Sequence, residues 1–422
     1  MIEILKKEDC VGCNACVQRC PKQCISMHED EQGFLYPKVD LSLCIHCDLC
    51  EKVCPVINQA EPRKPTETYA AKNPDYDVRM SSSSGGIFYA LAMKIIEDGG
   101  VVFGAKFNEQ WEVVHDYAET LEGIKAFQGS KYVQSRIGDT FLQAEEFLKA
   151  GRKVMFTGTP CQIAALGLFL RKDYGKQLLK VDVVCHGVPS PLVWREYLKY
   201  ITRPKGASAG KNTVFSSLKE TPVITGISFR DKRLGWEKFG FSVRVAASQA
   251  SGKNSVLSAI SQENPTEFFE PFSDNLYMRI FLKDLDLRPS CYQCPAKTGK
   301  SMSDYTIGDF WGVDFLLPTI FEDSGVSLLL DYSSKIKIAD ELDMVASASN
   351  YGVALRSNPA IEQSVKRPKV YNLFWQQFHS ENISTAELIL KKMNMPIYRR
   401  ILRRVGNMLP LYIKSTIKHY LE

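Results

Sequence analysis

The sequence has no long hydrophobic run and, after residue 54, very few cysteines. Its most apolar helix-like stretch, IAALGLFL at 163–170, is far shorter than the about 18–20 apolar residues that span a bilayer. The N-terminus also lacks the charged, apolar and cleavage segments of a signal peptide. We therefore expect a cytoplasmic protein without a transmembrane helix, in which clustered cysteines are metal ligands rather than disulfides.

The chain has no excess of positive charge outside its C-terminal end. The formal net charge is +5, but residues 391–422 carry all of this excess, and the remainder is slightly acidic. The body therefore gives no indication of nucleic-acid binding. In the tail, Ile397, Ile401 and Leu402 lie opposite arginines in a predicted short helix before Pro410. This basic amphipathic tail predicts either peripheral contact with an anionic membrane surface, at the inner membrane face, or a solvated helix packed on the body.

Nine of the 13 cysteines lie in the first 54 residues, most of them in two copies of one spacing, CVGCNACVQRCP and CIHCDLCEKVCP. Each copy is C-x2-C-x2-C-x3-C-P, the run of bacterial two-cluster ferredoxins, in which the fourth cysteine ligates the other cluster. The pattern predicts two [4Fe–4S] clusters, one on Cys10, Cys13, Cys16 and Cys54, the other on Cys44, Cys47, Cys50 and Cys20. Two zinc sites are the alternative, but the third cysteine and the C-P argue against them. Cys24 is expected to be a packing residue.

The length of 422 residues predicts two or three domains. We expect a ferredoxin domain at 1–60, a linker at 61–68 marked by prolines and mixed charge, a large domain at 69–390 and the basic tail at 391–422. The large domain opens with SSSSGG, directly before a predicted helix at 87–96 and a strand at 101–107. Such a loop is either a flexible linker or an anion-binding loop at a helix N-terminus. A second candidate loop is QGSKYVQS at 128–135.

Cys161 stands at the start of a predicted helix, directly after the strand 153–158. A helix at 138–150 precedes this strand, and a second strand ends at Cys185. This succession indicates a parallel crossover, so both cysteines should lie beyond the carboxyl ends of neighbouring strands, where open α/β sheets bind ligands. With Cys291 and Cys294 they make four, enough for a third [4Fe–4S] cluster or a zinc ion; the alternative is two buried cysteines and an unrelated CxxC. Residues 223–245 predict paired strands around a turn at 234–235.

Taken together, several ordered stretches of the sequence resemble the coenzyme F-420 hydrogenase/dehydrogenase beta-subunit family. They are SSSSGGIF, GSKYVQS, TGTPCQIAAL, CHGVPSP, SFRDKRLGW, and CYQCP followed by SDYTIGDFWG, spanning about residues 79–312. The resemblance implies FAD and an iron–sulfur cluster within the large domain, the cluster on Cys161, Cys185, Cys291 and Cys294. It also implies FAD-binding residues in three loops, namely Ser82, Ser83, Ser84, Gly85, Gly86, Ser130, Lys131, Tyr132, Thr157, Gly158 and Thr159.

We therefore expect a mixed α/β protein, with a small ferredoxin-like domain and a larger flavin-binding domain whose sheet is partly parallel. The predicted function is electron transfer between [4Fe–4S] clusters and FAD, with hydride passing to or from an organic substrate. That substrate is the deazaflavin coenzyme F-420 or another unsaturated small molecule, with a link to polysaccharide synthesis as one option. A ferredoxin-like protein or a dehydrogenase or hydrogenase subunit would be the redox partner. The alternatives are an electron-transfer subunit without a substrate of its own, and an iron–sulfur protein without flavin.

Overall fold

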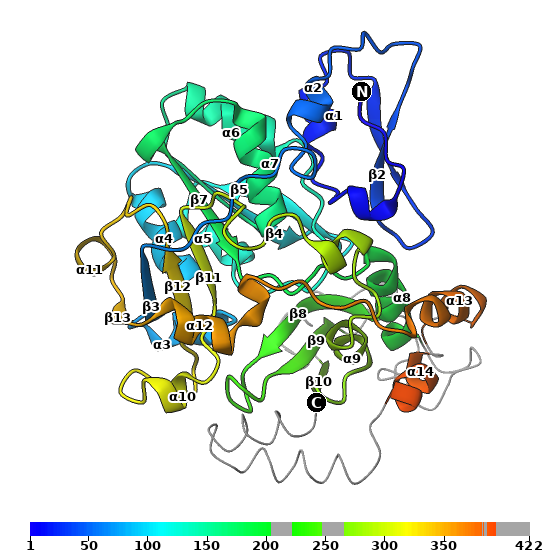
Figure 1. Cartoon of the computed structure of the whole chain (residues 1–422). Coiled ribbons are helices and arrows are strands. Elements are labelled where there is room, and N and C mark those ends of the chain that lie inside the picture. Colours follow the sequence, from blue (N-terminus) through cyan, green and yellow to red (C-terminus); the bar gives the residue numbers. More distant parts are fainter. Residues whose placement is uncertain (204–221, 247–265, 382, 384–385, 394–422) are drawn as a thin grey trace, which may run out of the picture.

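The computed structural model describes residues 1–203, 222–246, 266–381, 383 and 386–393. Figure 1 shows three parts: a small N-terminal module, a large sheet covered by helices, and a smaller sheet with helices of its own. The predicted mixed α/β class is confirmed. No helix in this described part is long and apolar enough to cross a bilayer. The predicted helix of the basic tail lies outside the described residues, which end at 393.

The N-terminal module pairs one hairpin with two short helices. Strands β1 (Ile25–Glu29) and β2 (Leu35–Val39) are antiparallel, and the helices are α1 (Ala15–Arg19) and α2 (Leu49–Lys52). Each helix begins after a residue in the left-handed region, Asn14 with φ 61° and Asp48 with φ 58°. Asn and Asp tolerate this conformation because their short side chains bond locally. The repeated cysteine spacing therefore gives two similar loop-to-helix turns.

The large sheet has the strand order β13-β3-β12-β11-β7-β6-β4-β5 within the described residues. Its strands are β3 (Glu67–Lys72), β4 (Val101–Phe107), β5 (Val113–Ala118), β6 (Val154–Gly158), β7 (Leu178–Val183), β11 (Tyr305–Asp309), β12 (Ser327–Asp331) and β13 (Val345–Ala348). The centre, β11-β7-β6-β4, is parallel, and the flanking pairs are antiparallel. The predicted parallel crossover is confirmed as β6, α7 (Pro160–Leu170) and β7.

Alternation along the central strands sends side chains to two covered faces. Val101 and Phe103 pack under α6 (Thr140–Lys149) and α7, whereas Val102 packs with α4 (Ile87–Glu97) and α5 (Leu121–Ile124). Burial on both faces explains why these strands read as continuous apolar runs. The same three layers place the carboxyl ends of β4, β6, β7 and β11 along one edge of the sheet.

A second, antiparallel sheet lies beside the first, below it in Figure 1. Its strands are β8 (Val223–Asp231), β9 (Gly240–Ala246) and β10 (Thr266–Pro271), in the order β10-β9-β8. The predicted hairpin around 234–235 is thereby confirmed. The helices α8 (Pro191–Thr202), α9 (Leu276–Leu282), α13 (Tyr371–Glu381) and α14 (Ala386–Met393) contribute to its core. The remaining helices are α3 (Tyr76–Ser81), α10 (Val313–Leu316), α11 (Ile338–Glu341) and α12 (Tyr351–Ser357).

The N-terminal module packs directly on α6 and α7. Val11, Ala15 and Val53 of the module share one buried core with side chains of both helices. Arg19 crosses the same boundary, with its guanidinium 3.7 Å from the ring centroid of Phe169, and bonds the Phe169 carbonyl. The segment that follows the module is also held, because the Arg63 backbone N–H donates to the Thr298 carbonyl at 2.9 Å. The module therefore has a defined position on the large domain.

Candidate functional site

The eight cysteines of the two ferredoxin runs line two cavities, four to each. The first set, Cys10, Cys13, Cys16 and Cys54, lines one of them. The second set, Cys20, Cys44, Cys47 and Cys50, lines the other, together with Cys24, whose Sγ lies 3.4 Å from that of Cys20. The grouping follows the predicted exchange of the fourth cysteine, because Cys54 lies with the first run and Cys20 with the second.

The thiols of the first set affect one another. Burial, followed by the nearby Cys10 and Cys54, raises the pKa of Cys16 to about 12. Burial, with Cys16 next, likewise raises the pKa of Cys13. Thiols held this close are protonated unless a cation takes the place of the protons. As placed, no group of three or more His, Cys, Asp or Glu side chains in the described residues could hold a metal ion. Cluster ligation by these cysteines therefore stays a prediction.

The third set consists of Cys161, Cys185, Cys291 and Cys294, which the structure brings together from three segments. Gly158 of β6 pairs with Asp182 of β7, and Cys161 and Cys185 each lie three residues beyond these partners. The other two cysteines come from η4 (Pro289–Gln293) and its end, more than one hundred residues later. Burial raises the pKa of Cys161 to about 12, with Cys294 next and Cys185 contributing. Burial also raises the pKa of Cys185 to about 11, and Cys294 again adds to the effect.

Backbone contacts hold the loop that follows β7 against η4. Pro189 and Leu287 form an isolated antiparallel bridge. The Val188 N–H points to Cys291 Sγ at 3.4 Å. Gly187, with φ 154°, allows this approach, because an added Cβ would lie 2.7 Å from Leu287 and 3.4 Å from the Cys291 Cβ. Lys297 Nζ donates to the Cys185 carbonyl at 2.5 Å and so ties the loop to the segment after Cys294.

Two of the three loops predicted to bind FAD, the serine loop at 81–86 and the loop at 128–135, lie in contact. The Ser130 backbone N–H donates to Ser83 Oγ at 2.5 Å, and Gln128 Nε2 donates to Ser82 Oγ at 3.2 Å. The Ser84 hydroxyl donates to the Val326 carbonyl, and the Gly85 N–H donates to Ser327 Oγ. Gly86, at φ 83°, turns the chain into α4. The serine loop is therefore an ordered turn that opens onto a helix, which favours the anion-binding alternative over a flexible linker.

The third predicted loop, Thr157–Thr159, joins the second loop through α7. Gln162 accepts from the Thr159 N–H at 2.9 Å and donates to Ser135 Oγ at 3.0 Å. Sequence reasoning missed His115, which is buried beside this loop with Nε2 3.0 Å from the Thr157 carbonyl. Burial lowers the pKa of His115 to about 4, so the ring is neutral near pH 7. Its other nitrogen, Nδ1, has no hydrogen-bond partner among the described residues.

Two lysines near these loops hold the fold rather than present free cations. Lys131 Nζ donates to the carbonyls of Ala126 and Gln128, at 2.8 and 2.9 Å. Lys232, from the SFRDKRLGW stretch, donates to the carbonyls of Arg79, Ser84 and Ser324, at 2.6–2.8 Å. Lys232 therefore fixes the serine loop. No local signal selects this residue, because an isolated lysine usually lies in solvent.

Arg230 joins three of the predicted stretches. Its guanidinium bonds Asp309 through Nη1 at 2.8 Å and Nη2 at 3.2 Å, and Nη1 also donates to the Tyr132 hydroxyl at 3.2 Å. Trp236 Nε1 donates to Asp309 Oδ1 at 2.8 Å, and its ring stacks on Trp311 with centroids 5.1 Å apart. Burial opposes the charge of Arg230, but the attraction to Asp309 outweighs it and raises the arginine pKa. Of this cluster, sequence reasoning selected only Tyr132 as a site residue.

Asp286, between α9 and η4, is a buried carboxyl without a partner. It is 0% exposed, and neither carboxyl oxygen has a hydrogen-bond partner among the described residues. Burial raises its pKa to about 8, and Asp284 adds to the effect. The carboxyl group of Asp286 in turn contributes to the raised pKa of three tyrosines, Tyr277, Tyr292 and Tyr371. Asp286 is therefore protonated in the folded protein at pH 7.

We expect Asp286→Asn to remove a pH dependence of stability. The carboxyl pKa is raised from 3.8 in the unfolded chain to about 8 in the fold. Its stabilising contribution is therefore complete below the lower value and is lost as the pH rises toward the upper one. From pH 6.5 to 8.0 the wild type should lose up to about 1.4 kcal/mol per pH unit relative to the variant. Thermal unfolding of both proteins at the two pH values measures this; a constant difference in melting temperature contradicts it.

Comparison with known proteins identifies two regions of the chain. Residues 9–58 match the 4Fe-4S dicluster domain, and residues 151–339 match the C-terminal part of the family described as "Coenzyme F420 hydrogenase/dehydrogenase, beta subunit". The second match contains all four cysteines of the third set, as well as Arg230 and Asp309. The serine loop and the loop at 128–135 precede it.

Individual relatives cover mainly the N-terminal module. An uncharacterized ferredoxin of Methanocaldococcus jannaschii is 34% identical over 68 residues, which are 15% of this chain and 87% of the relative. The chain is 43% identical over 51 residues to "Ferredoxin 7Fe" of Hydrogenibacillus schlegelii, covering 12% of this chain and 59% of that protein. Among solved structures, the F420-reducing [NiFe] hydrogenase complex from Methanosarcina barkeri aligns with a TM-score of 0.41 and 15% identity, over 78% of this chain and 92% of that one. The chain therefore carries a 4Fe-4S dicluster domain at its N-terminus, and its residues 151–339 belong with the C-terminal part of the coenzyme F420 hydrogenase/dehydrogenase beta subunit.

Proposed function

We propose that the protein is an iron–sulfur flavoprotein oxidoreductase, with residues 1–60 as the ferredoxin domain and residues 69–390 as the flavin domain. It would pass electrons between three [4Fe–4S] clusters and FAD, and hydride to or from an organic substrate. The observation that carries this proposal is the third set of cysteines, gathered from three segments at the carboxyl edge of the large sheet. This edge is where α/β sheets bind ligands.

The cysteines fit the clusters in number, grouping and chemistry. Each of two cavities is lined by the four cysteines of one predicted set, as a two-cluster ferredoxin requires. In the third set, burial first and at least one neighbouring thiol as well raise the pKa of Cys161, Cys185 and Cys291. A cluster supplies one-electron steps when bound, and its iron replaces the thiol protons. The protein's part is to hold the twelve sulfurs and to shield most of them from solvent.

The residues of the large domain also fit a flavin with its phosphates. The ordered serine loop opens onto α4, whose N-terminus suits an anion. Buried Arg230 Nε and His115 Nδ1 have no hydrogen-bond partners among the described residues, so each has a donor or acceptor to offer a ligand. FAD, when bound, exchanges two electrons as hydride and single electrons with the clusters. The family description favours coenzyme F420 as the substrate to test first, and other unsaturated small molecules remain in the class.

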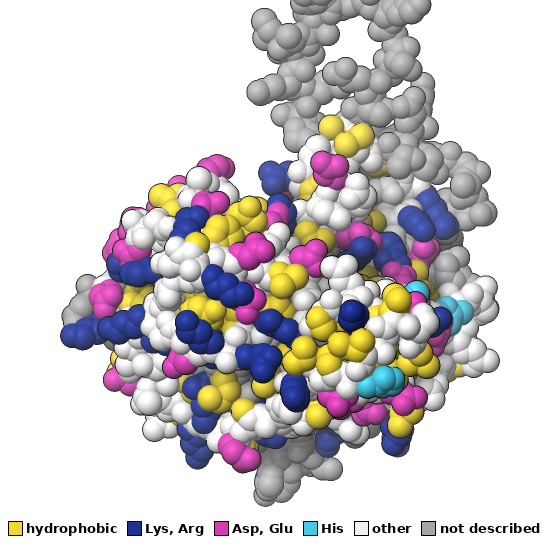
Figure 2. Space-filling view, turned by 90° about the horizontal axis from the view of Figure 1, so that it is seen from above, with side chains coloured by type: hydrophobic (Ala, Val, Ile, Leu, Met, Phe, Trp, Pro, Cys, Tyr) yellow, Lys and Arg dark blue, Asp and Glu magenta, His cyan; other side chains and the backbone are white. Residues whose placement is uncertain are grey.

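A second candidate function is an electron-transfer subunit that delivers electrons to a partner protein. It is favoured by exposed apolar side chains next to the second set: Leu41 is 63%, Leu43 54% and Ile45 55% exposed. Cys47, a predicted ligand, is itself exposed. Figure 2, which looks down on the molecule from the side of the N-terminal module, shows hydrophobic side chains gathered among charged ones on this face. Such a surface suits a redox protein that must approach a cluster closely.

Anaerobic purification followed by substrate assays separates the two functions. For the oxidoreductase we expect about one FAD per chain and reduction of coenzyme F420 after the protein is reduced with dithionite. The reverse assay, bleaching of the protein by reduced F420, should work if the couple is reversible. Flavin-free protein that reduces no small molecule but reduces an added ferredoxin would contradict the oxidoreductase and support the electron-transfer subunit.

A further inference from the structure

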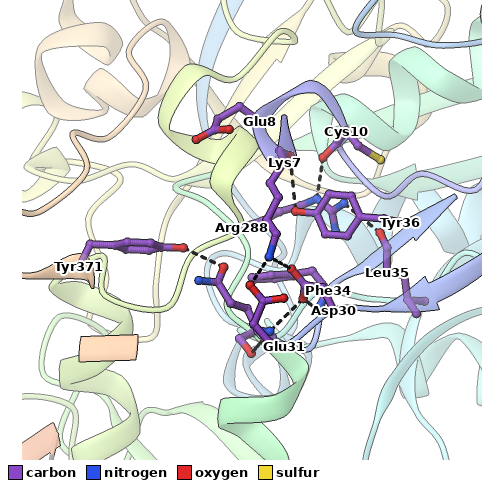
Figure 3. Close-up of polar contacts among 12 residues, drawn as sticks. Lys7, Glu8, Cys10, Asp30, Glu31, Phe34, Leu35, Tyr36, Arg288 and Tyr371 are labelled. Carbon is purple, nitrogen blue, oxygen red and sulfur yellow. Dashed lines mark hydrogen bonds and ion pairs between the residues drawn. The ribbon is translucent and has the colours of Figure 1, made fainter. Parts of the chain in front are cut away.

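Arg288 is a buried arginine, 1% exposed, at the boundary between the N-terminal module and the large domain. Its Nε donates to the Cys10 carbonyl at 2.8 Å, and its Nη2 donates to the Leu35 carbonyl at 2.9 Å. Its guanidinium carbon lies 4.4 Å from the ring centroid of Tyr36. Figure 3 shows the side chain reaching from the large domain between these groups. The side chain therefore binds the loop around Cys10, which carries cysteines of the first set.

The backbone of Arg288 contacts the third set. Its N–H donates to the Val188 carbonyl at 3.0 Å, and its carbonyl accepts from the Cys291 N–H at 2.9 Å. Gln134 runs parallel to it: Nε2 donates to the Val11 carbonyl at 3.0 Å, Oε1 accepts from Arg288 Nη1 at 3.0 Å, and the backbone N–H donates to the Pro189 carbonyl at 3.0 Å. Short hydrogen-bonded paths therefore connect the Cys10 loop with the loops of Cys185 and Cys291.

The first set faces the large domain, and the second faces away from it. Cys13 lies in the same buried core as α6 and α7, and Cys161 packs against that core. Cys47 of the second set is exposed. The positive charge of Arg288 also acts on Cys161, since it opposes the rise in that thiol's pKa caused by burial. The buried cation therefore lies within electrostatic reach of the third set while it bonds the first.

We infer that Arg288 is a positioning residue that locks the Cys10 loop against the third set and makes the first set the inner electron-transfer centre. This inference rests on the proposed function, because it assumes that the third set holds a cluster. In the step that Arg288 would support, one electron would pass between a cluster held by the first set and a cluster held by the third, so that one is oxidised as the other is reduced. No bond forms or breaks, and no proton moves. The second set is then the outer centre, which exchanges electrons with the partner.

The test compares Arg288→Gln with Arg367→Gln in the full-length protein. Arg367 is the matched control, since it also bonds across the boundary, to Glu8 at 3.0 Å, but its side chain is 41% exposed. Amide hydrogen exchange in the loop 10–16 should rise about tenfold or more in Arg288→Gln, because a charged donor to two carbonyls is lost. The spin coupling between the reduced first and third clusters, seen by electron paramagnetic resonance, should weaken in the same variant. Arg367→Gln should change neither readout.

A second variant keeps the inference testable if Arg288→Gln does not fold. Gln134→Leu leaves Arg288 in place but removes the parallel path, so its exchange and spin coupling should change in the same direction by less. A wild type with about eight irons per chain removes the proposed function itself, since the third set is then empty. The role of Arg288 alone is overturned by a different result, in which the wild type holds about twelve irons per chain. In that result, amide hydrogen exchange and spin coupling in Arg288→Gln and in Gln134→Leu equal those in Arg367→Gln.

Discussion

Replacing Cys161 with alanine should lower the iron content from about twelve to about eight per chain and leave the N-terminal clusters in place. The expectation follows from the geometry, because Cys161 is one of four half-buried cysteines whose thiols interact near the carboxyl ends of β6 and β7. Electron transfer from dithionite to the flavin should slow strongly, since the route from the module to the sheet edge loses its last iron centre.

Cys24→Ala is the matched control for this experiment. Cys24 is a buried cysteine that lines the cavity of the second set without belonging to either ferredoxin run. Its replacement should leave the iron, sulfide and flavin contents unchanged. Iron, sulfide and flavin are measured on the same anaerobic samples of all three proteins. About eight irons in both wild type and Cys161→Ala would make Cys161 a structural thiol, and the module would then have to reduce the flavin directly.

The parallel part of the sheet and the positions of Cys161 and Cys185 can be predicted from local sequence signals. Strand-helix-strand periodicity predicts that β6 and β7 are parallel neighbours, and this order places Cys161 and Cys185 at one edge. The alternation along 223–245 predicts the β8-β9 pair in the same way. Both features depend on the regular spacing of apolar residues within segments of about thirty residues, and this spacing can be read from a single sequence.

Other parts of the site depend on contacts between residues far apart in the sequence, and such contacts produce no periodic pattern in the local sequence. Cys291 and Cys294 reach the sheet edge because the bridge between Pro189 and Leu287 joins two distant loops. In the sequence, Arg288 looks like an ordinary surface arginine, and only the structure shows that the N-terminal module covers it. Lys131 has contacts that the local pattern does not reveal: the glycine-serine-lysine turn predicts a cation facing a ligand, and in the structure the ammonium group bonds carbonyls of its own turn. Its contact with FAD stays a prediction.

Replacing Asp309 with asparagine should destabilise the protein by about 3–5 kcal/mol, because it leaves the charge of Arg230 buried without its partner. Arg230 is 5% exposed, and both terminal nitrogens of its guanidinium donate to the carboxylate of Asp309. Asparagine can still accept the Trp236 bond, so the variant mainly removes the negative charge. We also expect it to lose FAD during purification, because Tyr132 and the two tryptophans are positioned through this pair.

The neighbouring pair Arg233–Asp231 provides the control. Its ions are 2.6 Å apart, but the Arg233 side chain is 39% exposed, so Arg233→Gln should cost less than about 1 kcal/mol. The double variant Arg230→Met with Asp309→Leu should be more stable than Asp309→Asn, because it buries no unpaired charge. Chemical denaturation and flavin content, measured on the same preparations, separate the two effects. If the double variant is stable yet still lacks FAD, the pair serves the flavin directly; if it is stable and retains FAD, the pair only supports the fold.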